Sequence, residues 1–491
     1  MKNAIKISTF LALHIFCYFI LEFKETIFGK QNVVILYMLF NLFFVAGLCL
    51  YGFFQKWLLK LFSNKILLFL CCLIYWALGV LAFVSNNNAI YLAAVGLANV
   101  ITGIFGGVAY FSIYAIVPKW WRGRVIAAGI CGGTVIQYFV DFARLLPNNT
   151  FSSFVYISTF SLAVLGSFLL LLDKSIVQMD NTIINSNTNI EHINQNTLFI
   201  LLVLSVVIIC YLSSLYEGVM TLAYPSGEQS FCINILLNST RLLYSASVIV
   251  AGVIADLKGR QYLPLISVIV MTILIFNVFL LNFPAIKIVN WVILFIGAGF
   301  LAMFVTLSFI DIASLTKKPA LWAGGGRIIK HSVTAFGSVI GAYFWSNPVT
   351  GLFAILIQYL VLLVVLIFLL FKLYEILTQK TYAGDIINNI TQTISPICPG
   401  ELQTQPVESY QNSLELEIEK YNFTAREKQI LSFVLAGLQI KEIAKELYIT
   451  ERTVKFHITN ILKKTGVKNQ KELISILVYK NHSLSNSLQF L

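Results

Sequence analysis

The stretch that decides how this chain is organised lies near its C-terminus, where residues 423–480 read FTAREKQILSFVLAGLQIKEIAKELYITERTVKFHITNILKKTGVKNQKELISILVYK. Thr424 followed three residues later by Glu427 is the pattern of a capping box, in which each side chain accepts the backbone N–H of the other residue. Apolar residues then recur at helical spacing up to Gly437. The stretch therefore predicts an α-helix that begins at a capped N-terminus and ends at a glycine.

Three more helices are expected after it, over residues 440–447, 451–464 and 470–479. The helix over 451–464 carries an apolar stripe that can face a core and a basic remainder that can face solvent. Its stripe is Val454, Ile458, Ile461 and Leu462, and the other positions are Arg452, Lys455, Phe456, Thr459 and Lys463. Two short helices joined by a tight turn, the second with a basic free face, are typical of a helix-turn-helix.

Charge supports the same interpretation. Residues 421–482 contain eleven Lys and Arg against five Glu, and 11 − 5 gives a net charge of +6. Phosphate is the natural partner of so basic a unit. Charge alone also fits a solvated helical bundle with an ordinary surface. The choice between a DNA-binding unit and such a bundle therefore rests on the identity of the residues.

The same stretch resembles the LuxR-type DNA-binding domain, and the resemblance covers about an eighth of the chain. The matching residues are Thr424, Arg426, Glu427, Leu431, Ala436, Gly437, Lys441, Glu442, Ile443, Ala444, Leu447, Ile449, Thr453, Val454, Lys455, His457, Asn460, Ile461, Leu462, Lys464, Gly466 and Val467. The resemblance implies a four-helix domain whose partner is double-stranded promoter DNA and whose output reaches the transcription machinery.

The resemblance also implies roles for single residues. Lys455, Phe456 and Thr459 would face base edges, Lys441, Arg452, Thr453 and His457 would lie near phosphates, and Lys463 on the same free face completes the expected DNA-binding set. Glu427 and Asn460 would be internal hydrogen-bonding residues. Neither Phe456 nor Thr459 reads G or A through two hydrogen bonds, so the operator sequence stays open. One such unit reads few base pairs, and we expect a homodimer on an inverted repeat, paired near Ile474 and Val478.

Composition places the rest of the chain in a membrane. Of 491 residues, 58% are apolar and only 11% are charged, against roughly 25% charged in soluble domains. The eight cysteines fall mostly in apolar runs and form no C-x-x-C pair, which excludes a disulfide framework and a metal site. No group of residues typical of catalysis or of a cofactor site stands out, so we expect no enzyme activity, no cofactor and no metal.

Twelve mainly apolar stretches are long enough to cross roughly 30 Å of hydrocarbon. They lie near 5–23, 33–54, 65–84, 90–117, 124–142, 153–172, 197–221, 233–256, 262–281, 288–312, 321–345 and 351–371. An Asn-rich segment, 173–195, divides them six and six. The expected fold class is all-α: a twelve-helix transmembrane bundle followed by a small four-helix helix-turn-helix domain in the cytoplasm.

The distribution of Lys and Arg predicts the orientation. With the N-terminus inside, thirteen Lys and Arg fall in inner loops against four in outer loops. This positive-inside bias predicts a multi-pass protein of the cytoplasmic (inner) membrane with both termini in the cytoplasm. The first apolar run has no small-residue cleavage site after it, so we interpret it as a span and not as a signal peptide.

Two loop motifs give the membrane part a resemblance to the major facilitator superfamily of twelve-span transporters. Gly252–Arg260 fits G-x-x-x-D-x-x-G-R, and Pro118–Arg124 fits P-x-x-x-R-G-R. The resemblance implies that such loops latch the two halves of the bundle on the inner side. The equivalent first-half loop, Gly52–Lys60, has Lys56 where Asp256 stands in the second half, and this loss argues against active transport.

Ionisable residues inside spans are costly and usually face the bundle interior. Arg327, Lys330 and His331 share one face of the eleventh expected span, and Glu217 and Arg241 lie in the seventh and eighth. They are candidates for binding an unknown anionic or zwitterionic small molecule near the midplane. The alternative is interhelical ion pairs and snorkelling. His14, Glu22 and Asp141 are weaker candidates, and the G-x-x-x-G pairs at 103–107, 129–133 and 337–341 are interpreted as close helix packing.

Residues 372–420 turn polar, with three Lys against seven acids, and predict a flexible tether with a mean reach on the order of 40 Å. The expected organisation is thus a transporter-like domain over 1–371, a linker over 372–420, the helix-turn-helix over 421–482 and a tail over 483–491. Three functions stay open: a membrane-anchored regulator that senses a small molecule, a working secondary transporter with a regulatory tail, and a regulator for which the membrane part is only an anchor.

Overall fold

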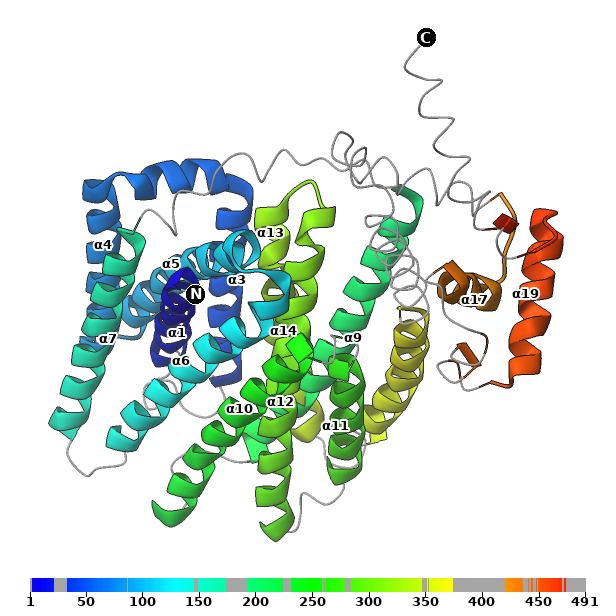
Figure 1. Ribbon diagram of the computed structural model, residues 1–491. Helices are drawn as coiled ribbons and strands as arrows, with labels where there is room; N and C mark the ends of the chain where they lie inside the picture. Colours follow the sequence, from blue (N-terminus) through cyan, green and yellow to red (C-terminus); the bar gives the residue numbers. More distant parts are fainter. Residues whose placement is uncertain are drawn as a thin grey trace. The chain divides into compact units, whose positions relative to one another are not determined.

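The computed structural model divides into two compact units, Met1–Phe371 and Lys372–Leu491, drawn in Figure 1. The residues it describes are 2–21, 33–85, 87–144, 149–173, 192–223, 231–257, 260, 262–278, 284–346, 351, 353–373, 420–435, 440, 443–444, 447, 449–469 and 472–473. The predicted tether and C-terminal tail, and most of the Asn-rich segment, lie outside these residues.

The first unit is a bundle of long helices (Figure 1). In chain order they are α1 (Lys2–Leu21), α3 (Val33–Ser63), α4 (Lys65–Val84), α5 (Asn88–Ile116), α6 (Arg122–Arg144), α7 (Asn149–Leu171), α9 (His192–Ala223), α10 (Phe231–Leu257), α11 (Tyr262–Val278), α12 (Pro284–Ile312) and α14 (Gly325–Ser346), with short elements η1 (Lys119–Trp121), η2 (Ala313–Leu315) and α13 (Pro319–Ala323) between them. A last apolar helix spans Phe353–Leu373.

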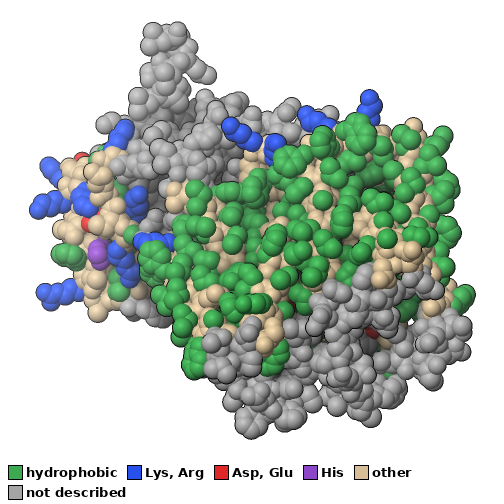
Figure 2. Space-filling view, turned by 180° about the vertical axis from the view of Figure 1, so that it is seen from behind, with side chains coloured by type: hydrophobic (Ala, Val, Ile, Leu, Met, Phe, Trp, Pro, Cys, Tyr) green, Lys and Arg blue, Asp and Glu red, His purple; other side chains and the backbone are tan. Residues whose placement is uncertain are grey.

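Ten of the described helices are long and apolar enough to cross a membrane. Two of the twelve predicted spans fall outside that group. The described part of α11 has 17 residues, and α14, although it has 22, carries two charges among its polar residues. The multi-pass, all-helical architecture is therefore confirmed, whereas the count of twelve stays a prediction. Figure 2 shows a broad apolar surface over this unit, as a hydrocarbon environment requires.

The helices differ from the predicted spans and loops at three places. The expected loop after residue 54 is helical, because α3 continues across a kink at Phe54 to Ser63. That extension has no proline or glycine, and it buries Leu58 and Phe62, four residues apart, while Lys56 and Lys60 stay exposed. α9 begins at His192, inside the segment expected to be linker. The eleventh span is interrupted at Gly324, which ends α13 before α14 begins.

Helices of the bundle approach one another closely at glycines. α14 packs against α9 of its own half and against α3 of the other half, and α10 packs against α6. At Gly341 of α14, an added Cβ would lie 2.1 Å from the carbonyl oxygen of Leu215 on α9. At Gly103 of α5, it would lie 2.2 Å from the carbonyl oxygen of Phe44 on α3. The interpretation of the G-x-x-x-G pairs as close helix packing is confirmed.

The second unit has its own hydrophobic core around α17 (Ala425–Leu435) and α19 (Glu451–Thr465). The predicted stripe of α19 supplies Val454, Ile458 and Ile461, each buried, while Leu462 is half-buried. Ile443 and Ala444 from the segment between the two helices complete this core together with residues of α17. Because these contacts all come from residues 421–473, we expect the unit to fold without the membrane part.

Candidate DNA interface and membrane site

The N-terminus of α19 is fixed by its own sequence. The Thr450 hydroxyl accepts the backbone N–H of Thr453 at 3.2 Å, and Gly466 ends the helix in the left-handed conformation, at φ 73°. A residue with a side chain adopts this conformation only under strain, which explains the glycine. The cap holds the first turns of α19 in place, and these turns carry the candidate DNA-contacting side chains.

A buried carboxylate ties α17 to the end of α19. The Glu427 carboxylate accepts the backbone N–H of Thr424 at 2.8 Å, and the Thr424 hydroxyl accepts the N–H of Glu427 at 3.3 Å, which is the predicted capping box. Lys464 Nζ donates to the same carboxylate at 2.6 Å. Burial by itself raises the pKa of Glu427, but the hydrogen bonds from Lys464 and Thr424 outweigh it and hold that pKa below its ordinary value.

The face of α19 that turns away from the core is basic and includes an exposed aromatic ring. Arg452, Lys455, Thr459 and Lys463 are exposed, and Phe456 is 62% exposed. Figure 2 shows Lys and Arg side chains standing out from this unit. Thr453 and His457 are half-buried at the edge of the face, and Lys441 lies outside the described residues. Single exposed apolar residues are common on protein surfaces, and Phe456 is notable only because it lies among the basic residues of the candidate DNA-binding face.

Within the membrane unit, a polar cluster joins the two halves. His331 of α14 contacts Asn41 of α3 through Nδ1 and Oδ1 at 2.6 Å, and it contacts the Tyr18 hydroxyl of α1 at 3.3 Å. Arg327, one turn earlier on α14, is 6% exposed, and its guanidinium lies 6.0 Å from the centre of the Tyr110 ring of α5. Residues of the second half therefore meet residues of the first half deep in the bundle.

The other three candidate ligand residues lie differently. Arg241 forms an ion pair with Asp141 at 2.8 Å, and Asp141 also accepts hydrogen bonds from Gln137 and Tyr156. Glu217 accepts a hydrogen bond from Ser213 at 3.2 Å. Lys330 is half-buried. Arg241 therefore forms an interhelical ion pair, which was the alternative to ligand binding. Its partner in that pair is Asp141.

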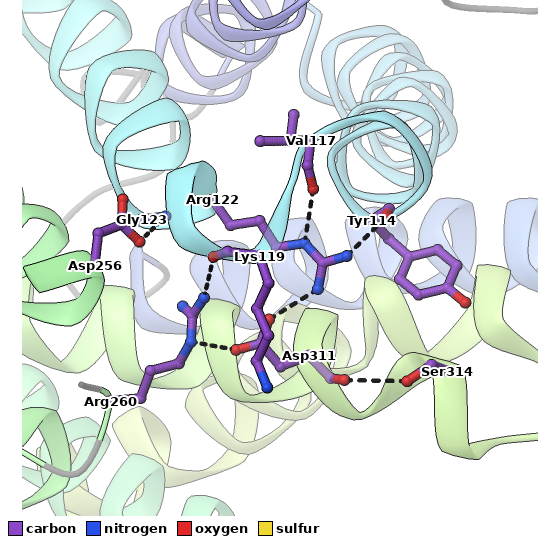
Figure 3. A network of polar contacts seen from close by, with 9 residues as sticks. All are labelled: Tyr114, Val117, Lys119, Arg122, Gly123, Asp256, Arg260, Asp311 and Ser314. Carbon is purple, nitrogen blue, oxygen red and sulfur yellow. Dashed lines mark hydrogen bonds and ion pairs between the residues drawn. The ribbon is translucent and has the colours of Figure 1, made fainter. Parts of the chain in front are cut away.

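A second polar network lies at one end of the bundle and also joins the halves (Figure 3). The Asp256 carboxylate accepts the backbone N–H groups of Gly123 and Arg124 at 2.9 and 2.8 Å, at the positive N-terminus of α6. Asp311 of α12 pairs with Arg122 at 2.9 Å and with Arg260. We call Arg122, Asp256, Arg260 and Asp311 the latch, because it fastens α6 of the first half to α10 and α12 of the second.

Comparison with known proteins identifies the second unit. A family model described as "Bacterial regulatory proteins, luxR family" matches residues 421–477. The Spore germination protein GerE of Bacillus subtilis is 39% identical over 51 residues, which make up 69% of that protein and 10% of this chain. The chain belongs to the luxR family of bacterial regulatory proteins. Its LuxR-type unit is the DNA-binding domain of a transcriptional regulator.

Other relatives of this luxR-family chain match it over a small part of its length. The transcriptional regulatory protein LnrK of Bacillus subtilis is 36% identical over 104 residues, or 19% of this chain and 47% of LnrK. The transcriptional regulatory protein LiaR, from the same organism, is 43% identical over 61 residues, or 12% of this chain and 28% of LiaR. The chain thus spans less than half the length of either relative.

The membrane unit has a structural counterpart. The crystal structure of the human organic anion transporter MFSD10 (TETRAN) superposes with a TM-score of 0.56 at 12% sequence identity, covering 75% of this chain and 99% of that one. At this identity the likeness concerns the fold alone. The membrane unit of the luxR-family chain therefore has a major facilitator-like fold, as its loop motifs predicted.

Sequence reasoning missed several residues that the structure brings together. Asp311 completes the latch, and Tyr18, Asn41 and Tyr110 surround Arg327 and His331. Asn41 and Asp311 carried a signal, since each is a polar residue within an otherwise apolar span. Tyr18 and Tyr110 carried no such signal in the sequence. No group of three or more His, Cys, Asp or Glu side chains suited to a metal occurs within the part of the chain that the structure describes.

Proposed function

We propose that this chain is a membrane-bound, one-component transcription regulator. The LuxR-type domain binds promoter DNA through α19, and the major facilitator-like unit senses a small molecule. The observation that carries the proposal is the polar cluster between the halves: a ligand that binds there can change how the halves pack, and the change can reach the attached DNA-binding unit. On this proposal the protein is not an enzyme, and it acts as a homodimer at its operator and on the transcription machinery.

Lys455→Ala in the isolated fragment 412–491 should weaken binding to the specific operator by about 1–3 kcal/mol, with less effect on a scrambled duplex. Lys455 is exposed in the first turns of α19, opposite buried Val454 and Ile458, where it can reach base edges. Lys441→Ala is the comparison: it should weaken both duplexes alike and lower the salt slope by about one. Equal losses on both duplexes for Lys455→Ala would remove this residue from base readout.

The proposed location is the cytoplasmic membrane with both termini in the cytoplasm, supported by the excess of Lys and Arg in alternate loops. Fusions to alkaline phosphatase and to green fluorescent protein after Leu491 should give fluorescence without phosphatase activity. Phosphatase activity at that end would contradict the topology and would place the LuxR-type domain away from DNA.

A second function is favoured by the latch. Because ionic contacts between halves are suited to opening and closing, the bundle can also be a working secondary transporter with a regulatory tail. The structural counterpart is by its title an organic anion transporter. Uptake of organic anions by vesicles that contain the purified protein, driven by a proton gradient, would support transport. Uptake no faster than in empty vesicles would leave sensing as the function.

A further inference from the structure

Arg327 is a buried cation whose hydrogen-bonding capacity is largely unused. The side chain is 6% exposed, and its Nε and Nη2 atoms have no hydrogen-bond partner. Among the described residues it forms no ion pair; its guanidinium has a side-chain hydrogen bond with Tyr244 and lies 6.0 Å from the centre of the Tyr110 ring. Two N–H-bearing atoms of the guanidinium fork are therefore free, although they lie inside the bundle.

Within the described part of the membrane unit, the other partly buried arginines form ion pairs. Arg241 forms an ion pair with Asp141 at 2.8 Å, and Arg122 forms one with Asp311 at 2.9 Å. An unpaired charge taken out of water costs several kcal/mol, so an arginine kept in this state indicates a partner that comes from outside the chain. His14 gives an independent indication at the same place: it is 3% exposed, and neither ring nitrogen has a hydrogen-bond partner.

The surroundings limit the chemistry of that partner. One unpaired guanidinium balances one negative charge, and its planar fork matches the two oxygens of a carboxylate. The neighbouring side chains are mainly rings: His14 lies 6.2 Å from Tyr110 and 5.8 Å from Phe44, and Phe44 lies 4.7 Å from His331, measured between ring centres. Rings accommodate an apolar body better than a second charge or many hydroxyl groups.

We propose that Arg327 binds the carboxylate of a small organic monoanion whose apolar body lies among these rings. The inference deepens the proposed function and rests on it in one respect, namely that this monoanion is the signal. Arg327 and His331 belong to the second half, whereas His14, Phe44 and Tyr110 belong to the first. Entry of the ligand requires the halves to separate, and its binding then favours the arrangement in which both halves contact it.

The test uses the purified full-length protein in detergent, with thermal unfolding followed by tryptophan fluorescence. The probes are benzoate, its neutral amide benzamide, acetate and chloride. Benzoate should raise the unfolding midpoint in a concentration-dependent way, because a ligand that binds only the folded state stabilises it. Benzamide lacks the charge and acetate lacks the apolar body, so both should have much smaller effects. An equal rise of the unfolding midpoint with chloride would overturn the inference that the site binds a carboxylate, and would indicate an inorganic anion.

Arg327→Gln separates ligand binding from a structural role. Without ligand, this variant should unfold at a higher temperature than the wild type, because it removes an uncompensated buried charge. Its affinity for benzoate should fall at least about 100-fold. Arg327→Lys, which keeps the charge and loses the fork, should bind with intermediate affinity. Lys6→Gln removes a cation remote from the cluster, at the surface contact with Asp173, and should bind as the wild type does.

Besides an equal rise with chloride, two further results would overturn the inference. One is a lower unfolding midpoint of ligand-free Arg327→Gln, which would show that Arg327 is held by the protein itself. The other is an unchanged midpoint of the wild type at millimolar benzoate. Neither result touches the proposed function, which fails separately if the membrane unit has no influence on DNA occupancy in cells. Conversely, benzoate binding without any such influence would leave the inference standing and remove the proposed function.

Discussion

Asp311→Asn should destabilise the membrane unit by about 3 kcal/mol, because it leaves Arg122 and Arg260 without the anion that both contact. The side chains of Asp311 and Arg122 are only 10% and 12% exposed, so solvent screens the loss weakly. The measurement is the thermal unfolding midpoint of the full-length protein in detergent. Since the latch joins the two halves, the variant should also be cut faster by protease at that end of the bundle.

The matched control is Asp173→Asn, the same substitution at another ion pair. Asp173 pairs with Lys6, and their side chains are 33% and 28% exposed, so this pair is worth about 0–1 kcal/mol. Lys6 also belongs to the first half, so this pair does not join the halves. Equal shifts of the midpoint for Asp311→Asn and Asp173→Asn would show that the latch contributes no more than a surface contact.

Gly341→Ala should destabilise the bundle by about 3 kcal/mol, because the added methyl group would lie 2.1 Å from the backbone oxygen of Leu215. Backbone cannot rotate away as a side chain does, so α9 and α14 have to separate along their contact. We expect less protein in the membrane and a lower unfolding midpoint for what remains.

Gly324→Ala is the control for this prediction. There the added Cβ would have its nearest neighbour at 3.6 Å, an ordinary van der Waals distance, and the residue lies just before α14. The Gly324→Ala variant should accumulate in the membrane and unfold at the same midpoint as the wild type. If the two variants behave alike, the close approach at Gly341 does not stabilise the bundle.

The LuxR-type unit could be predicted in detail because its determinants are local. The predicted capping box at Thr424 and Glu427 acts over a few residues, and the structure has it. The cap at Thr450 and the end of α19 at Gly466, which the structure also shows, are equally local. The face of α19 followed from helical periodicity for the same reason. The DNA contacts themselves stay predictions, since they depend on a partner molecule.

The membrane site was predicted less well because its contacts are distant in sequence. His331 meets Asn41 across 290 positions, and Asp311 meets Arg122 across 189. Helical spacing says which residues share a face, but it does not say which helix lies opposite. Arg241 illustrates this: its place inside a span indicated either a ligand or an interhelical ion pair, and the packing of α10 on α6 gives it Asp141 as its partner.

We expect the state of the membrane unit to control how much of its operator DNA the LuxR-type domain occupies. The most direct measurement is genome-wide crosslinking of the full-length protein and its Asp311→Asn variant, compared at equal amounts in the membrane, with the soluble fragment 412–491 alongside. All three should occupy the same sites, and loosening the latch should change the occupancy of the full-length protein there. Equal occupancy by the wild type and the variant would contradict the claim and would make the membrane unit an anchor only.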